Sequence, residues 1–136
     1  MASVGPRPLL VPVNPPGAAF PGVSTAMRIR GGDLTILSGH VPVEANGELV
    51  VGDFEAQLDA AFRAIGRTLA AAGAGYEALV RLTIYVVDYD PAMLAVLKRV
   101  RSRYVSAEAP PASAFVAVAA LYDARIKVEI DGFAVV

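Results

Sequence analysis

The chain has 136 residues, 55% of them hydrophobic, and its 12 basic and 13 acidic residues give a net charge of −1. This length suits a single domain, residues 1–136. The balanced charge argues against a nucleic-acid partner. The lack of an apolar run of about 18 residues argues against a membrane span. The absence of cysteine excludes disulfides and thiolate metal sites within the chain, and it predicts a cytoplasmic protein because nothing in the sequence requires an oxidising compartment.

The N-terminal part of the chain is rich in proline. Residues 1–22 therefore predict an extended, irregular lead-in. Two short strands are expected next, at Ala26–Arg30 and Leu34–Ser38. Gly31-Gly32-Asp33 lies between them and is typical of a turn, so the pattern predicts a β-hairpin.

The clearest helical pattern follows Asp53, whose carboxylate can accept hydrogen bonds from the free N–H groups of a first helical turn. Apolar residues then recur with the spacing of a buried helix face. Gly73 and Gly75 predict the end of this helix. The apolar residues are Leu58, Phe62, Ile65, Leu69 and Ala72.

The second half of the chain predicts a strand, a helix and two further strands. Apolar and polar residues alternate over 80–87, which is the period of a strand. Asp90-Pro91 is expected to open a helix, because proline is tolerated at the first helical position. Strands are expected at Ser113–Ala120 and Ile126–Asp131. The buried stripe of this helix is predicted to be Leu94, Leu97, Val100 and Tyr104.

The resulting order, β-β-α-β-α-β-β, predicts an α+β fold in which two helices cover one face of a sheet. The other face, expected to carry Tyr85 and Phe115, has no helix left to cover it. An uncovered, half-apolar face is a candidate subunit interface. Basic residues of the second helix are expected to form a solvated surface, and they are Lys98, Arg99, Arg101 and Arg103.

Four blocks of the sequence together follow a known pattern. They are Leu34–Pro42 (LTILSGHVP), Asp53–Gly73 with its closing Ala-Ala-Gly, Val80–Asp88 (VRLTIYVVD), and Pro111–Leu121 followed by Val128–Asp131. This combination resembles the RidA/YjgF family, also called the L-PSP or enamine/imine deaminase family. The resemblance implies a chorismate-mutase-like fold, a homotrimer around a central barrel, and a small-molecule pocket at each subunit interface.

The resemblance also implies a reaction and its residues. Typical members hydrolyse an imino or enamino acid to a keto acid and ammonia, with no cofactor or metal, because a protonated imine is already electrophilic. The water-positioning glutamate of the family falls on Glu129, and a Ser-Gly pair of the pocket falls on Ser38 and Gly39. His40 replaces the glutamine that follows this pair. It is the only histidine, so it is a candidate acid-base group near neutral pH, or else a structural turn residue.

Two further positions differ from the family pattern. The arginine that clamps the substrate carboxylate falls on Ser113, and an N-terminal tyrosine falls on Val23. Losing a charged contact costs about 1.5–3 kcal/mol or more, which is roughly tenfold to over a hundredfold in affinity. With Phe115 and Tyr85, these residues form the predicted substrate-binding set and indicate a less acidic or more hydrophobic substrate. Ser113 is equally consistent with a small structural strand residue.

Three functions remain open at this point. The first is a divergent hydrolase, deaminase or isomerase of an imine, enamine or carbonyl compound, with Glu129 and His40 as catalytic residues. The second is a conventional 2-imino acid deaminase in which Arg28, Arg30 or Arg125 replaces the missing clamp. The third is a non-catalytic trimer that binds a ligand. A metal site is not expected, because one histidine and scattered carboxylates offer no ligand spacing.

Overall fold

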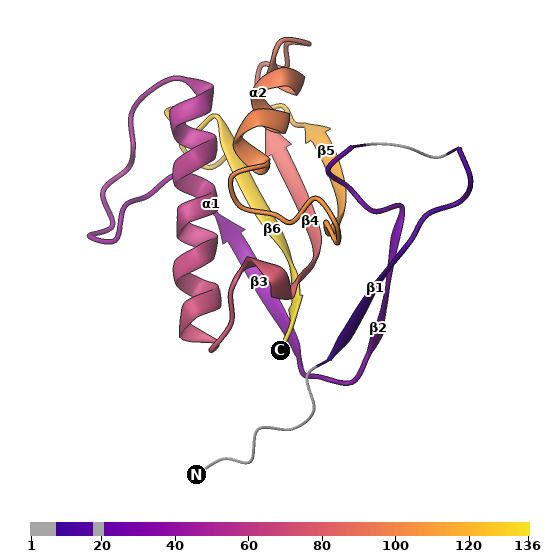
Figure 1. The fold of residues 1–136 in the computed structure, drawn as a ribbon. Helices are drawn as coiled ribbons and strands as arrows, with labels where there is room; N and C mark the ends of the chain where they lie inside the picture. The colour runs from indigo at the N-terminus through magenta and orange to yellow at the C-terminus, as the bar shows by residue number, and fades with distance from the viewer. Residues whose placement is uncertain (1–7, 18–20) are drawn as a thin grey trace.

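The computed structural model describes residues 8–17 and 21–136, so parts of the predicted lead-in, 1–7 and 18–20, lie outside the described residues. A four-stranded sheet carries both helices on one face, and a two-stranded ribbon lies beside it (Figure 1). The elements are β1 (Leu9–Val13), β2 (Ala26–Arg30), β3 (Leu34–His40), α1 (Phe54–Ala71), the 3₁₀ turn η1 (Tyr76–Ala78), β4 (Leu79–Val86), α2 (Met93–Arg101), β5 (Ala112–Ala117) and β6 (Val128–Val135).

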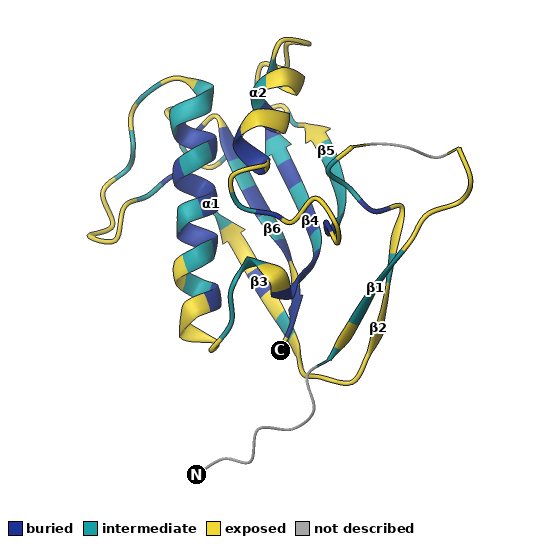
Figure 2. Cartoon of the chain, in the orientation of Figure 1, coloured by how far each residue is buried: buried dark blue, intermediate teal, exposed yellow. Residues whose placement is uncertain are grey.

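The main sheet has the strand order β3-β6-β4-β5. β4 and β5 are parallel, whereas β6 is antiparallel to both of its neighbours. The side chains of Leu82, Ile84 and Ile130 are fully buried on the face that the helices cover. Figure 2 shows that β4 and β6 hold most of the buried residues of the sheet, while β3 at the edge is largely exposed. The predicted α+β architecture, with two helices on one face, is confirmed.

The first helix begins and ends as the sequence predicts. Asp53 is its N-cap, and the Asp53 carboxylate accepts a hydrogen bond from the Ala56 N–H at 2.8 Å. Gly73 follows the helix with φ +78°, a conformation that glycine adopts without steric cost. Phe62 and the other apolar residues of the predicted stripe are buried, apart from Ala72, which is exposed at the C-cap.

The predicted hairpin between the second and third strands is wrong. β2 pairs antiparallel with β1, a strand within the lead-in predicted to be irregular, and β3 pairs with β6. Gly31 and Gly32 both have positive φ, as a tight turn requires, but β2 and β3 join different sheets and do not pair across this turn. Asp33 then exchanges two backbone hydrogen bonds with Val136, at 2.7 and 3.0 Å, and this exchange leads β3 into the main sheet.

The second helix differs from the prediction in two side chains. Leu94, predicted to be buried, is 46% exposed, and the helix begins two residues after Pro91, at Met93. Arg101, predicted to be solvated, is only 7% exposed. The reason is its position four residues after the buried Leu97, which places both side chains on the same helix face.

Gln57 connects α1 to two surface segments. Its side-chain amide donates hydrogen bonds to the carbonyls of Val50 (3.1 Å) and Arg125 (2.8 Å), and its carbonyl accepts one from the Lys127 N–H (2.7 Å). The side chain is 1% exposed. It therefore fixes the segment that leads into β6 and so the position of Glu129.

Replacing Gln57 by leucine is expected to lower the free energy of unfolding by about 2–4 kcal/mol, because three backbone groups lose a buried partner. Urea unfolding of the two proteins measures this difference. Gln57→Glu is the matched comparison: it keeps the shape and the acceptor for Lys127 but places a carboxylate oxygen against the Val50 and Arg125 carbonyls, so its loss should be at least as large. A Gln57→Leu protein within about 0.5 kcal/mol of wild type, the usual range of neutral surface changes, contradicts this role.

Aromatic and charged side chains join the two helices. The Tyr104 ring stacks on Phe62, with ring centroids 5.2 Å apart, and its hydroxyl donates to the Asp59 carboxylate at 2.5 Å. Burial, followed by this hydrogen bond, raises the pKa of Tyr104 to about 12. Burial alone would raise the pKa of Asp59, but the hydrogen bonds from Tyr104 and Arg103 outweigh it and hold that pKa below its ordinary value.

Tyr104 should therefore make stability fall at alkaline pH. A phenol whose pKa is higher in the folded state stabilises the fold fully below about pH 10, the pKa of a free tyrosine. This contribution is lost as the pH rises from 10 to about 12. Tyrosinate absorbance of the five tyrosines should include a component that titrates near pH 12, although Tyr76 and Tyr85 also have raised pKa values. Tyr104→Phe should remove that component, and an unchanged titration curve in this variant contradicts the assignment.

Candidate functional site

Glu129 lies on the face of the sheet that the helices leave uncovered. Its neighbours Val128 and Ile130 are buried in the core, so the alternation of the strand turns Glu129 the other way. The carboxylate packs against the backbone of Gly39, where any Cβ would overlap its Oε1 atom. Glycine at residue 39 thus leaves room for the carboxylate, which a larger residue there would displace.

Other polar side chains share this open face. Tyr85 is opposite Glu129 in the β4–β6 register, and its hydroxyl donates to the Asp131 carboxylate at 3.2 Å. Desolvation, followed by the charge of Asp131, raises the pKa of Tyr85, which keeps the phenol protonated. The Glu129 carboxylate forms no salt bridge with the residues that the structure describes. It is therefore available to accept a proton or to hold a water molecule.

The predicted substrate-binding residues of β5 lie on the other side of the sheet. Ser113 is in register with Leu82, and Phe115 with Ile84, and both partners face the helices. Phe115 packs against the core and contacts Tyr89 edge-on, with ring centroids 6.0 Å apart. The expectation that Phe115 lies on the open face is wrong, because the strand register places it on the alternate side.

The segment before β2 holds Val23 beside the start of β5. Ser24 forms a parallel bridge with Ala112, and its hydroxyl donates to the Pro110 carbonyl at 2.5 Å. Val23, half-buried, is the residue before this bridge, and Ser113 is the residue after Ala112. Val23 and Ser113, at both of which the sequence departs from the family pattern, therefore belong to neighbouring segments.

His40 is directed toward α1 rather than toward Glu129. One ring nitrogen, Nδ1, is 2.6 Å from the Ser38 carbonyl, and Nε2 is 2.7 Å from the Thr68 hydroxyl of α1. Because a carbonyl only accepts, Nδ1 carries the proton and Nε2 of the neutral ring accepts from Thr68. A bulge between Leu37 and His40 produces this orientation. Ser38 itself is exposed at this bulge.

The predicted site residues thus fall into two groups that one chain does not bring together. The first, with Glu129, Gly39 and Tyr85, is on the open face. The second, with Ser113 and Phe115, is on the helix-covered side of the edge strand β5, and Val23 lies beside it. A sheet separates the groups within one copy. The second group carries no cation at the position where the family pattern has its arginine.

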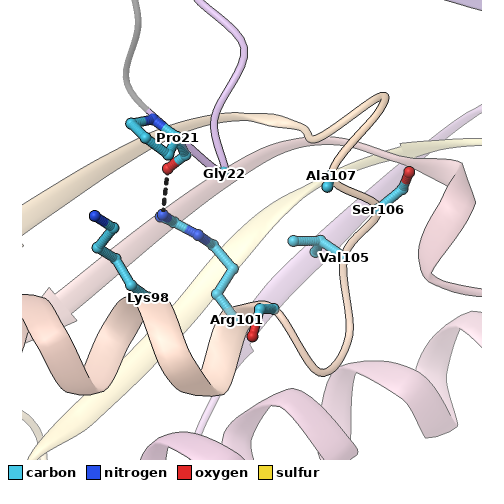
Figure 3. Close-up of a pocket in the computed structure, with 8 residues that line it drawn as sticks. Pro21, Gly22, Lys98, Arg101, Val105, Ser106 and Ala107 are labelled. Carbon is cyan, nitrogen blue, oxygen red and sulfur yellow. Dashed lines mark hydrogen bonds between the residues drawn. The ribbon is translucent and has the colours of Figure 1, made fainter.

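The burial of Arg101, near Val23, was not predicted from the sequence. The Arg101 guanidinium donates to the Pro21 carbonyl at 3.1 Å and lines a hollow of about 270 Å³ (Figure 3). Burial lowers the pKa of Arg101. Its spacing of four residues from Leu97 indicates the buried face of the helix. The basic residues around it, however, are typical of a solvated face.

Two kinds of feature are absent from the described residues, a metal-binding cluster and a membrane-spanning helix. No group of three or more His, Asp or Glu side chains within 8–17 and 21–136 is arranged to hold a metal ion. No helix in that part of the chain combines the length and apolar character needed to cross a bilayer.

Comparison with known proteins gives consistent matches. Residues 18–136 match the family described as Endoribonuclease L-PSP. Protein DfrA of Myxococcus xanthus is 39% identical over 113 residues, which cover 82% of this chain and 83% of DfrA.

Solved structures agree with these sequence matches. YyfB of Yersinia pestis, a protein of unknown function in the conserved Rid family, is 33% identical with a TM-score of 0.85, covering 93% of this chain and 98% of YyfB. RidA of an Antarctic Psychrobacter is 31% identical with a TM-score of 0.68, covering 88% and 92% of the two chains.

Proposed function

The chain belongs to the Endoribonuclease L-PSP family, and its structural neighbours include two Rid proteins; on this basis we propose that it is a cofactor-free hydrolase of small imines or enamines. The observation that carries the proposal is the division of the site. The Glu129 carboxylate, which forms no salt bridge with the described residues, lies on one side of the sheet, and the side chains of Ser113 and Phe115 lie on the other. When two copies of the chain meet, the Glu129 group of one copy and the Ser113 group of the other can together form one site.

The open face of the sheet supports a homotrimer with one cleft at each interface. Its exposed apolar side chains are Leu34 (63%), Ile36 (70%) and Phe133 (40%) on the neighbouring strands β3 and β6. Ile36 and Phe133 are opposite each other in the register, so they form a continuous apolar surface. Contact between copies removes this surface from water, which is favourable by about 25 cal/mol per Å² of apolar area. It also places the Glu129 group of one copy against the β5 edge of the next.

The proposed reaction needs one water molecule and no redox step. Glu129 accepts a proton as the water oxygen attacks the carbon of a protonated imine, which gives a tetrahedral carbinolamine. Glu129 returns this proton to nitrogen, the C–N bond breaks as the C=O bond forms, and the carbinolamine hydroxyl proton passes through Glu129 to the departing ammonia. The balanced change is protonated imine plus water to carbonyl compound plus ammonium. The phenol of Tyr85, held by Asp131, lies on the same face and can orient the substrate.

The substrate we propose is less acidic or more hydrophobic than a simple 2-imino acid. Ser113 can donate one hydrogen bond, but it cannot neutralise a carboxylate as a bidentate arginine does. Val23 and Phe115 add apolar surface to the same half of the cleft. A ribonuclease reaction, suggested by the family description, receives little support from a net charge of −1.

A panel of imines tests the proposal. Imines generated in solution from amino acids, amino acid amides and simple amines are presented to the protein, and ammonia and carbonyl product are measured. Turnover above the spontaneous rate is expected, with the uncharged imines preferred. No turnover with any imine contradicts the proposal. If a metabolite then raises the melting temperature, the ligand-binding alternative replaces it.

A further inference from the structure

The last turn of α2 holds a cation that no acidic side chain of the chain neutralises. Arg101 is 7% exposed, yet among the described residues its guanidinium has one acceptor, the Pro21 carbonyl. All 13 acidic residues lie within the described ranges, and none forms a salt bridge with Arg101. The neighbouring Arg99 and Arg103 behave differently, because both pair with Glu55. An unneutralised buried cation is costly unless an anion completes its surroundings.

The hollow beside Arg101 is rich in hydrogen-bond donors. Lys98, three residues earlier, lines the same hollow with its ammonium group (Figure 3). The Ser106 hydroxyl oxygen accepts from the N–H groups of Glu108 and Ala109, so its proton remains free to be donated. The guanidinium adds five N–H groups to the lining of the hollow, of which one is used by Pro21.

The rest of the hollow is small and mostly apolar. Gly22 closes one side, and a Cβ there would be 2.7 Å from the Arg101 guanidinium, so glycine allows the close approach of the backbone. Pro21, Val105 and Ala107 supply apolar surface. The volume of about 270 Å³ suits a ligand of a few carbon atoms. A planar guanidinium beside apolar walls matches a carboxylate that carries a short hydrocarbon chain.

We propose that Lys98, Arg101 and Ser106 bind a small organic carboxylate at a site separate from the cleft that contains Glu129. The hollow includes neither Glu129 on the open face nor Ser113 on β5. The inference therefore does not depend on the proposed hydrolysis. It gives Arg101 a binding role in addition to its contact with the segment before β2.

An NMR titration of the full chain at constant ionic strength tests this site. The probes are butanoate, its uncharged analogue butanamide, and inorganic phosphate. Butanoate should bind most tightly, and Arg101→Met should weaken it about 10- to 100-fold, which is the usual effect of losing a charged hydrogen bond. Arg99→Gln is the matched control, because it removes the adjacent, 52% exposed arginine outside the hollow, and it should leave the affinity unchanged.

Two further variants keep the test decisive if Arg101→Met does not fold. Lys98→Gln and Ser106→Ala each remove one donor and should each weaken butanoate binding. Equal binding of butanoate and butanamide, tighter binding of phosphate, or affinities unchanged in the variants of the hollow would overturn the proposal. So would the absence of any binding.

The outcome is independent of the imine assay. Glu129→Gln should bind butanoate as wild type does, and loss of binding in that variant would overturn the separation of the two sites. Imine turnover without butanoate binding removes this inference alone. Butanoate binding without imine turnover removes the proposed function alone.

Discussion

Replacing Glu129 by glutamine is expected to lower kcat for imine hydrolysis by about 10²–10⁴-fold, the usual contribution of a general base. The amide keeps the size and shape of the carboxylate beside Gly39, so packing of β3 against β6 should be retained. What it loses is the ability to accept a proton from the attacking water. Initial rates of ammonia release from the preferred imine, with circular dichroism as a check on folding, measure the effect.

Asp131→Asn is the matched control for this variant. It makes the same chemical change two residues along β6 on the same face. The amide oxygen introduced at residue 131 can still accept the hydrogen bond from Tyr85. Its rate should stay within a few-fold of wild type. If the two variants lose activity equally, the face acts through its total charge, and the specific role of Glu129 is contradicted.

Replacing Ile36 by aspartate is expected to convert the proposed trimer into monomers. Ile36 is 70% exposed in one copy, so the aspartate is tolerated in the monomer, whereas burying its charge between copies is strongly unfavourable. Light scattering should show a mass that falls from that of three 14.1-kDa copies to that of one. Turnover should fall by at least about 100-fold, because the two halves of the cleft no longer hold the substrate in one geometry.

Leu94→Asp provides the comparison for this interface variant. Leu94 is also an exposed apolar residue, at 46%, but it lies on α2, away from the open face. This variant should remain trimeric and active. A wild-type protein that is already monomeric and active rules out the inter-subunit cleft, and an active Ile36→Asp monomer leads to the same conclusion.

The regular elements were predictable from the sequence because local patterns determine them. Asp53, the apolar stripe of α1 and Gly73 each act within a few residues, and each was found as expected. The pairing of β2 was not predictable in the same way. It depends on contacts with β1 and on the hydrogen bonds between Asp33 and Val136, which are distant in the sequence.

The candidate site was predictable only as a set of residues. The pattern located Glu129, Gly39 and Ser113, but it gave no information about which face each side chain occupies. The bulge that turns His40 toward Thr68 and the register that turns Phe115 toward the core decide this, and both arise from strand pairing. The buried Arg101 had a helical-spacing signal, which the run of basic residues around it concealed.

The central claim is that the proposed cleft between two subunits hydrolyses imines, and that residue 113 does not bind a substrate carboxylate there. The most direct test compares wild type with Ser113→Arg on a matched pair of substrates, an imino acid and the imino amide of the same carbon skeleton. We expect wild type to prefer the amide, and Ser113→Arg to raise kcat/KM for the acid by about 10- to 100-fold. A wild-type enzyme that prefers the acid, together with no gain from Ser113→Arg, would show that another cation holds the carboxylate and would contradict the claim.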